Sequence, residues 1–474
     1  MPVDRRVYRH LQSLNQSLVF TFALYVEGRF PYQSATRRPA TAATTISAII
    51  EHRAYRIKLA SACRRSFGHA SGFGLFMSAR LDVLLPLPLT KKGPSYTCGM
   101  LAKGMAAPDF QVAITTPRAR GHRVFPAEVV QVLPYWARYL PYKWVRSLAR
   151  ENIERVFLSQ ITTARTEVGI AYIWPGASLD TIRALKRENI KIFREMINCH
   201  ERSAKIILDD AYRRLGLAPA HLITDASAVS EQATLEAVDY VFCPSAMVEA
   251  SLLENGLPAS KLVSASYGWD PQRFSGSGQL LPPCEGVTAV FAGSICVRKG
   301  CHLLLDYWAR SNVRGRLVLA GVLEPAIRER CSGLLGRPDV VVLDYVNDVG
   351  ALYRSADVFL FPTLEEGSPL VIYEACGCGL PVITTPMGMG RIVRHNQEGF
   401  VLDPYDSEGW VEAIRTLAED GGLRKLMGTA AAQRARSFHW DEVAIRRRQQ
   451  ILERVVPSFK PYTTSSAGVV GAGA

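Results

Sequence analysis

The sequence predicts an α/β protein with two Rossmann-like domains that face each other across a cleft. Two observations support this prediction. Apolar, strand-like runs alternate with helical segments from residue 78 onward, and a stretch rich in Gly, Ser and Pro at 275–286 divides this alternation in two. Ligands of such open sheets bind outside the carboxyl ends of the strands, so the cleft is the expected place for function.

The length of 474 residues fits two or three domains, and the predicted organisation has five parts. They are a basic extension expected to be disordered (1–77), a first Rossmann-like domain (78–275), a second (287–440), a helix packing back toward the first domain (441–457) and a disordered tail (458–474). The extension is rich in Arg, Ser and Thr and poor in acids, as targeting peptides are.

The net charge of +13 is concentrated near the N-terminus. Residues 1–80 hold 12 basic and 3 acidic residues, a net charge of +9, which leaves only +4 for the remaining 394 residues. A nucleic-acid-binding function therefore loses its main support, and no nucleic-acid partner is expected.

Other compositional features favour a cytoplasmic protein. No apolar run approaches the ~20 residues of a membrane-spanning helix. The longest early run, 18–26, is short and is not followed by a convincing signal-peptide cleavage site. None of the 10 cysteines forms a CxxC pair, so reduced and mostly buried thiols are expected.

The first domain opens with the pattern strand, glycine turn, helix, strand that begins a Rossmann-like unit. The turn is 91–95, and Ser95 is placed to cap the helix that follows. The expected strands are 80–89, 110–115, 168–174, 189–198, 239–244 and 261–267, and the expected helices are 96–106, 179–188 and 246–255.

The second domain alternates more regularly. Its expected strands are 287–293, 316–322, 340–346, 357–362 and 381–385, the last of which closes the set, and its expected helices are 299–311, 325–335, 349–356, 370–378 and 407–420, followed by the helix 442–456. Continuous apolar strands between helices are typical of a parallel sheet covered on both faces.

The most informative stretch, EEGSPLVIYEACGCGLPVI at 365–383, lies at a strand-to-helix turn. Ser368 is positioned to cap the helix, and Pro369 suits its first position because a proline there loses no hydrogen bond. The free amides and the positive dipole end of this helix form a site for a diphosphate. Glu366 lies just before the cap and Glu374 lies within the helix, so both carboxylates can face one pocket.

Glu366 and Glu374 are similar to the Glu-x7-Glu pair of the retaining family 4 glycosyltransferases, which have the GT-B fold. The surrounding segment resembles that family's signature along its whole length. The resemblance implies that Glu366 orients or stabilises the sugar ring and that Glu374 holds ribose hydroxyls. It assigns donor oxygens to a loop of four residues, Gly367, Ser368, Pro369 and Leu370.

A second motif, GSICVRKG at 293–300, follows the first strand of the second domain. It is similar to the family's Gly-Arg…Lys-Gly loop, whose cations bind the donor diphosphate. Lys299 matches the lysine and is a candidate catalytic residue. Ser294 stands where the family has Arg, and Arg298 is a candidate to supply the guanidinium. The family uses no catalytic metal, so the resemblance implies that fixed cations stabilise the departing nucleoside diphosphate.

The first domain resembles the family more weakly. Gly93, Pro94 and Ser95 correspond to its glycine-rich acceptor-side loop. His200 follows an expected strand, where family members carry a histidine that contacts the donor sugar near the reacting carbon. The resemblance thus adds His200 to Glu366 among the candidate catalytic residues, with a structural role for His200 as the alternative.

The resemblance implies a hexosyltransferase-type enzyme that moves a sugar from a nucleotide-sugar donor to an acceptor hydroxyl with retention of anomeric configuration. The implied acceptor is a glycan or a lipid-linked molecule, as in polysaccharide or glycolipid synthesis. No cofactor is expected, because the nucleotide-sugar is a co-substrate. The basic residues are compatible with a peripheral contact at the inner membrane surface. Domain closure is expected to exclude water and limit donor hydrolysis.

Two alternatives stay open at this point. A nucleotide-sugar epimerase or a phosphorylase-like protein can share the GT-B fold, and Ser294 in place of Arg leaves room for a donor-binding protein without turnover. A dehydrogenase is excluded, since no GxGxxG follows the first strand and no acidic residue stands at the ribose position.

Overall fold

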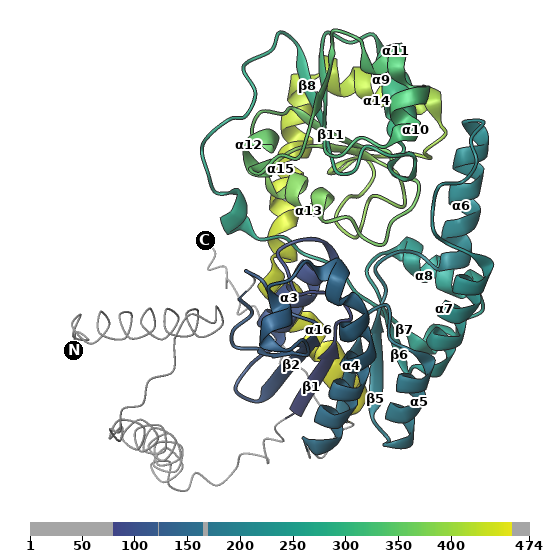
Figure 1. The fold of residues 1–474 in the computed structure, drawn as a ribbon. Coiled ribbons are helices and arrows are strands. Elements are labelled where there is room, and N and C mark those ends of the chain that lie inside the picture. The colour runs from purple at the N-terminus through teal and green to yellow at the C-terminus, as the bar shows by residue number, and fades with distance from the viewer. Residues whose placement is uncertain (1–78, 122, 165–168, 457–474) are drawn as a thin grey trace, which may run out of the picture. The chain divides into compact units, whose positions relative to one another are not determined.

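The computed structural model describes residues 79–121, 123–164 and 169–456. The predicted extension (1–77) and tail (458–474) lie outside the described residues. The described strands form two larger parallel sheets, each flanked by helices (Figure 1). The predicted α/β fold with two Rossmann-like domains is therefore confirmed.

The first sheet has the strand order β3-β2-β1-β4-β5-β6-β7. Its strands are β1 (Ala79–Leu84), β2 (Phe110–Thr116), β3 (Glu128–Gln131), β4 (Gly169–Ile173), β5 (Lys191–Glu195), β6 (Tyr240–Cys243) and β7 (Leu262–Ser264). In the parallel register, buried Leu81 of β1 lies beside Val112 of β2 and Ile170 of β4. The strand order reverses between β1 and β4, and ligands of open parallel sheets bind at such a point.

Six α-helices of the first domain are described: α3 (Gly93–Met105), α4 (Tyr142–Thr163), α5 (Leu179–Arg187), α6 (Glu201–Arg214), α7 (Asp225–Ala237) and α8 (Ala246–Glu254). Three short 3-10 helices are also described: η1 (Tyr135–Arg138) before α4, η2 (Ala259–Lys261) before β7, and η3 (Pro271–Phe274) between β7 and the second domain. Helices α4, α6 and α7 lie in segments without a predicted element.

The predicted cap of the helix α3 is wrong. Lys92 is the N-cap and makes no side-chain capping bond. Ser95 lies inside the first turn, where its hydroxyl accepts from the amide of Thr90 at 3.2 Å and donates to the carbonyl of Lys92 at 3.0 Å. The hydroxyl thus stabilises the preceding turn from within the helix.

The second sheet has the order β10-β9-β8-β11-β12-β13. Its strands are β8 (Val287–Ala292), β9 (Gly315–Ala320), β10 (Val340–Leu343), β11 (Val358–Phe361), β12 (Val382–Thr384) and β13 (Gly399–Val401). The expectation that 381–385 closes this sheet is wrong, because β13 pairs with β12. A side chain at Gly399 would place its Cβ 1.8 Å from the carbonyl oxygen of Val382, so a glycine permits this pairing.

The second domain carries α9 (Cys301–Ser311), α10 (Pro325–Arg330), α11 (Ser332–Leu335), α12 (Val349–Tyr353), α13 (Leu370–Gly377), α14 (Ser407–Glu419) and α15 (Gly421–Ala435), with the 3-10 turns η4 (Val297–Lys299) and η5 (Arg436–Phe438). The expected helix 325–335 is divided at Cys331 into α10 and α11. Helix α15 lies in a segment without a predicted element.

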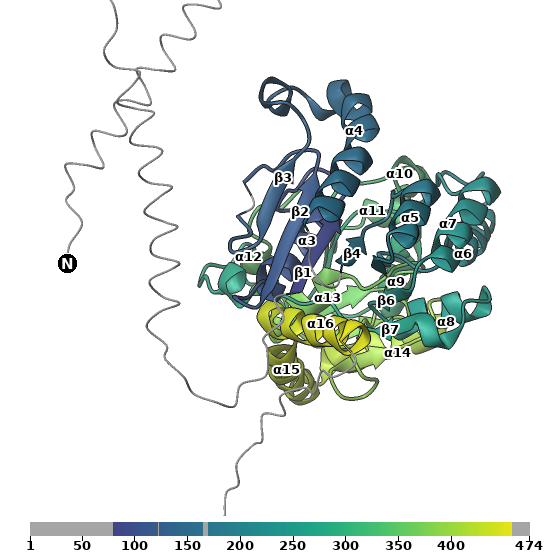
Figure 2. The same cartoon turned by 90° about the horizontal axis from the view of Figure 1, so that it is seen from below.

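The last described helix, α16 (Trp440–Val455), follows the second domain in sequence but lies beside α3 of the first domain (Figures 1 and 2). The helices approach closely where Gly104 meets Ala444, since a Cβ at Gly104 would lie 2.6 Å from that of Ala444. Arg447 of α16 forms a buried ion pair with Glu195 of β5. Helix α16 is thus an integral part of the packing of the first domain.

Candidate functional site

The candidate donor site lies at the carboxyl ends of β8 and β11, the neighbouring strands between which the order of the second sheet reverses. The motif 293–300 follows β8, and the motif 365–383 begins shortly after β11. Parallel strands end at the same edge of a sheet, so the topology brings the two motifs together.

Three of the predicted donor-site residues meet at this edge. Arg298 Nη1 lies 3.1 Å from Glu366 Oε1, and Lys299 Nζ forms an ion pair with the same oxygen. Lys299 and Glu366 are each only 8% exposed. Gly300, with a φ of 67°, turns the chain here and allows the close approach of the Pro362 carbonyl.

The cluster combines a buried lysine with a half-buried arginine. Burial lowers the pKa of Lys299, and the neighbouring Arg298 guanidinium acts in the same direction. The nearby Glu365 carboxylate opposes both effects on this pKa. Buried cations of this kind need an anionic partner, and in this structure the protein's own carboxylate supplies it.

The sequence prediction assigns no role to Glu365, yet its carboxylate connects the two domains. It accepts from Arg298 Nη1 at 3.3 Å and from the amide of Cys199, in the first domain, at 3.3 Å. Glu365 is 1% exposed. The sequence feature that could have predicted this role is the position of Glu365 beside Glu366 in the motif. Two adjacent acidic residues before a tight turn suggest that both carboxylates have hydrogen-bond or ion-pair partners.

Gly367 allows the donor loop to touch the first domain. A Cβ at this position would lie 2.2 Å from the carbonyl oxygen of Ile197, which follows β5. A larger residue would therefore push the two loops apart. The predicted donor-binding loop is thus also an interdomain contact.

The start of α13 differs from the prediction. Pro369 is the N-cap and Leu370 is the first helical residue, so the expected cap by Ser368 is wrong. The Ser368 hydroxyl instead lies 2.9 Å from the hydroxyl of Tyr373 within the protein interior. Among the described residues no acceptor pairs with the amides of Leu370 and Val371, which leaves them available to an anion.

Glu374 has a different cationic partner from Glu366. Its Oε1 lies 3.6 Å from Nη1 of Arg273 in η3. Burial raises the pKa of Glu374 to about 7, and Arg273 opposes this shift. The Arg273 guanidinium also lies 4.9 Å from the ring centre of Tyr96 in α3. Arg273 was not predicted, because it comes from the segment between the domains and belongs to no recognisable motif.

His200 is buried, and both of its ring nitrogens have protein partners. It is the N-cap of α6, where Nδ1 accepts from the amide of Arg202 at 3.1 Å. Nε2 lies 2.9 Å from the side-chain oxygen of Gln232. Its side chain is 0% exposed, and burial lowers its pKa. These contacts are compatible with the structural role that the sequence left open, and the catalytic role of His200 stays a prediction.

The other predicted positions lie at the edges of the site. Ser294 is exposed and has no side-chain hydrogen bond within the described part of the chain, whereas Arg298 contacts the carboxylates. Gly93 and Pro94 begin α3. Next to them, Lys92 Nζ lies 4.2 Å from the ring centre of Tyr345, so this loop contacts the second domain.

Residues 79–121, 123–164 and 169–456 contain neither a candidate metal site nor a candidate membrane-spanning helix. No group of three or more His, Cys, Asp and Glu side chains there is arranged to hold a metal ion. No helix of that part combines the length and the apolar character needed to cross a bilayer.

The residues of this site are similar to those of a known protein family. Residues 286–420 match the model of "Glycosyl transferases group 1". A D-inositol 3-phosphate glycosyltransferase of Arthrobacter sp. is 31% identical over 178 residues, 35% of this chain and 42% of the relative. The enzyme of that name from Pseudarthrobacter chlorophenolicus is 36% identical over 98 residues, 20% of this chain and 23% of its own. The chain thus spans less than half the length of these curated relatives.

Solved structures are similar to this chain across both domains. Sucrose-phosphate synthase from Thermosynechococcus elongatus has a TM-score of 0.60 at 18% identity, covering 80% of this chain and all of its own. Anabaena HepE in complex with UDP has a TM-score of 0.54 at 17% identity, with 79% and 99% covered. The fold is that of the GT-B glycosyltransferases. The predicted family resemblance is confirmed over residues 286–420, which match the group 1 glycosyltransferase model.

Proposed function

We propose that the protein is a retaining hexosyltransferase that moves a sugar from a nucleotide-sugar to an acceptor hydroxyl without a catalytic metal ion. The observation that carries this proposal is the cluster of half-buried Arg298 with buried Lys299 and Glu366 beside the amino end of α13. Two cations and free amides at the reversal point of a parallel sheet are suited to a diphosphate.

In the proposed mechanism the donor diphosphate replaces Glu366 as the partner of Lys299 and Arg298. The bond between the anomeric carbon and the β-phosphate oxygen breaks, and the cations stabilise the charge that develops on that oxygen. The acceptor oxygen bonds to the same face of the sugar and passes its proton to the departing phosphate. The freed Glu366 carboxylate stabilises the positive charge of the sugar ring, and Glu374 binds the ribose hydroxyls.

The named relatives support the general class of donor and acceptor. HepE was solved with UDP, and the curated relatives are named for a phosphorylated inositol acceptor. From these we propose a nucleotide-sugar donor and a hydroxyl-bearing glycan or lipid-linked acceptor for this chain.

The test is a donor-hydrolysis and transfer screen with UDP-, GDP- and ADP-sugars in the presence of EDTA. At least one donor should be consumed by the wild-type chain, with the anomeric configuration of the transferred sugar retained. Glu366→Ala should lose most of this turnover, while Glu412→Ala, at an exposed position of α14, should not. Loss of turnover with EDTA alone, restored by a divalent ion, would contradict metal independence.

The same screen separates the two alternatives. An epimerase returns an isomerised donor when no acceptor is present. A binding protein without turnover retains the nucleotide but releases no sugar. Either result would replace the transferase proposal.

We also propose that the first domain makes a peripheral contact with an anionic membrane. Five aromatic side chains of the segment 125–144 are 64% exposed or more, four of them on η1, its C-terminal end and the start of α4: Phe125, Tyr135, Trp136, Tyr139 and Trp144. Exposed basic side chains accompany them: Arg120, Arg123, Lys143, Arg146 and Arg150. Amphipathic aromatic rings and basic residues together favour the interface of a bilayer with anionic headgroups.

Buried apolar side chains support this exposed surface. Ala137 and Val145 are buried beneath it in a small apolar cluster. In sedimentation with phosphatidylglycerol vesicles, the full chain should bind more strongly than with phosphatidylcholine vesicles. The double variant Trp136→Ser, Trp144→Ser should lose most binding, whereas Leu222→Ser, Leu426→Ser, at exposed apolar positions elsewhere, should not. Equal binding of both double variants would reject this surface.

A further inference from the structure

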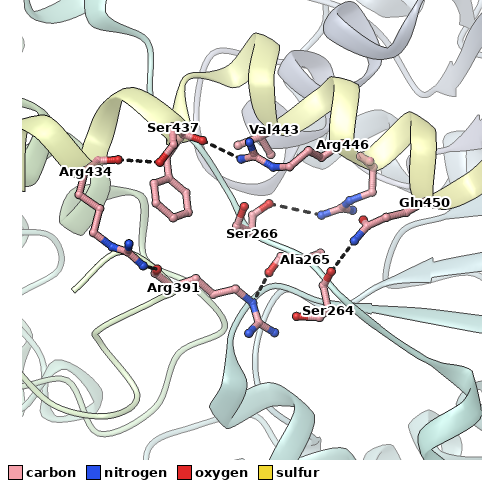
Figure 3. Close-up of a pocket in the computed structure, with 11 residues that line it drawn as sticks. Ser264, Ala265, Ser266, Arg391, Arg434, Ser437, Val443, Arg446 and Gln450 are labelled. Carbon is pink, nitrogen blue, oxygen red and sulfur yellow. Dashed lines mark hydrogen bonds between the residues drawn. The ribbon is translucent and has the colours of Figure 1, made fainter. Parts of the chain in front are cut away.

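A cavity of about 440 Å³ lies at the junction of the two domains, and none of its lining residues belongs to the donor site (Figure 3). One wall is the chain that leaves β7 in the first domain, from Ser264 to Ser266. The second domain contributes Arg391 and Arg434, and α16 contributes the last wall. The volume is within the range of small-molecule sites.

The lining is basic. It includes four arginines, Arg391, Arg434, Arg446 and Arg447, and no Asp or Glu. Around the cavity, Arg391 pairs with Glu249 at 2.9 Å and Arg447 with buried Glu195. Arg434 Nε lies 4.0 Å from Oε1 of buried Glu398, a carboxylate that it shares with Arg394. Arg446 has no carboxylate partner in the described part of the chain, so Arg434 and Arg446 are the less compensated cations of the lining.

Some N–H groups of Arg434 and Arg446 have no acceptor within the described residues. Arg434 donates to the backbone carbonyls of Ile392 and Arg391 through Nε and Nη2. Arg446 donates to the carbonyl of Ser437 through Nη2 at 2.7 Å. In the described part of the chain no acceptor pairs with Nη1 of Arg434, or with Nε and Nη1 of Arg446, and no carboxylate lies within ion-pair distance of Arg446.

Hydroxyl groups complete the polar lining. Ser264 and Ser266 line the cavity together with Gln450, whose amide donates to the carbonyl of Ser264 at 2.6 Å (Figure 3). Ser437 also lines it, but its hydroxyl donates to the carbonyl of Arg434 at 2.8 Å. Guanidinium groups bind phosphate through paired, charge-assisted hydrogen bonds, and serine hydroxyls suit either phosphate or sugar oxygens.

We propose that this cavity binds a small molecule that carries a phosphate group, at a site separate from that of the donor. The ligand's phosphate lies against Arg434 and Arg446, and the remaining volume takes a hydroxylated body. Because both domains and α16 form the walls, the bound molecule bridges the domains. A phosphorylated sugar fits this volume better than a free phosphate ion does.

The test uses the full chain and two probes, inorganic phosphate and glucose 6-phosphate, titrated calorimetrically at constant ionic strength. Glucose 6-phosphate should bind, and more tightly than inorganic phosphate. Arg446→Gln should weaken binding by roughly tenfold, the loss expected for one charge-assisted hydrogen bond. Ser437→Asp, which adds a carboxylate to an exposed position of the wall, should abolish it.

Two controls separate this site from its surroundings. Arg436→Gln removes one charge from the neighbouring exposed position and should bind both probes as the wild type does. Lys299→Ala alters the donor site and should also leave binding unchanged. The proposal is wrong if neither probe binds, or if Lys299→Ala removes binding while Arg446→Gln and Ser437→Asp retain it.

Discussion

At the scale of single residues, the charge of Lys299 depends on a neighbouring carboxylate. A buried ammonium group is costly without a counter-charge, and the contact with Glu366 supplies one until a substrate does. The motif predicted that both residues belong to one site, because family spacing constrains them. It did not predict Glu365 or Arg273, whose partners come from the other domain or the linker. Such partners are brought together by tertiary packing. They cannot be predicted from the spacing of residues within one segment of the sequence.

Glu374 carries a testable pH dependence. Its folded pKa of about 7 lies above the ordinary value of 4.5, so the folded state binds a proton that the unfolded state releases between these pH values. The associated stability is fully present below the ordinary pKa and is lost as the pH rises through 7. At about 1.4 kcal/mol per unit, the loss approaches ~3 kcal/mol.

Glu374→Gln should remove this dependence. In urea unfolding, the wild-type midpoint should fall more between pH 5 and pH 8 than the midpoint of the variant, because Gln does not titrate. Glu412→Gln, at an exposed position on α14, should follow the wild type. Parallel pH profiles for Glu374→Gln and wild type would contradict the assignment.

At the scale of elements, the five predicted strands of the second domain correspond to β8 to β12, because these strands are continuous apolar runs. Helix α4 was missed although Val145, Ala149, Ile153, Phe157 and Ile161 recur every four residues and are all buried. This narrow apolar stripe is the sequence pattern from which the helix could have been predicted. Strand β13 is three residues long, too short for a period of two to be visible, and its pairing depends on the close approach at Gly399.

The packing of α3 against α16 makes a second prediction. A Cβ at Gly104 would lie 2.6 Å from that of Ala444, so Gly104→Ala should force the helices apart and lower stability by about 1–3 kcal/mol. Gly333→Ala, in α11, meets nothing within 4 Å and should not destabilise the protein. Thermal unfolding of both variants provides the measurement. Unchanged melting of Gly104→Ala would show that the two helices are not closely packed.

At the scale of the whole molecule, the two domains meet through loops that also carry the site. Glu365 bonds the amide of Cys199, Gly367 touches the carbonyl of Ile197, and α16 returns to the first domain. The two-domain architecture followed from the alternation of elements and the linker. These contacts did not, because they join residues far apart in sequence. In this arrangement the donor residues are largely buried, so we expect the domains to separate when the donor enters.

The central claim is that Lys299, with Arg298 and the amino end of α13, binds the donor diphosphate without a metal ion. It is tested most directly by calorimetric titration of UDP, GDP and ADP into the full chain in EDTA. We predict that at least one diphosphate binds, that Lys299→Ala weakens it by roughly tenfold or more, and that Lys425→Ala, an exposed lysine of α15, does not. Unchanged affinity in Lys299→Ala would contradict the claim.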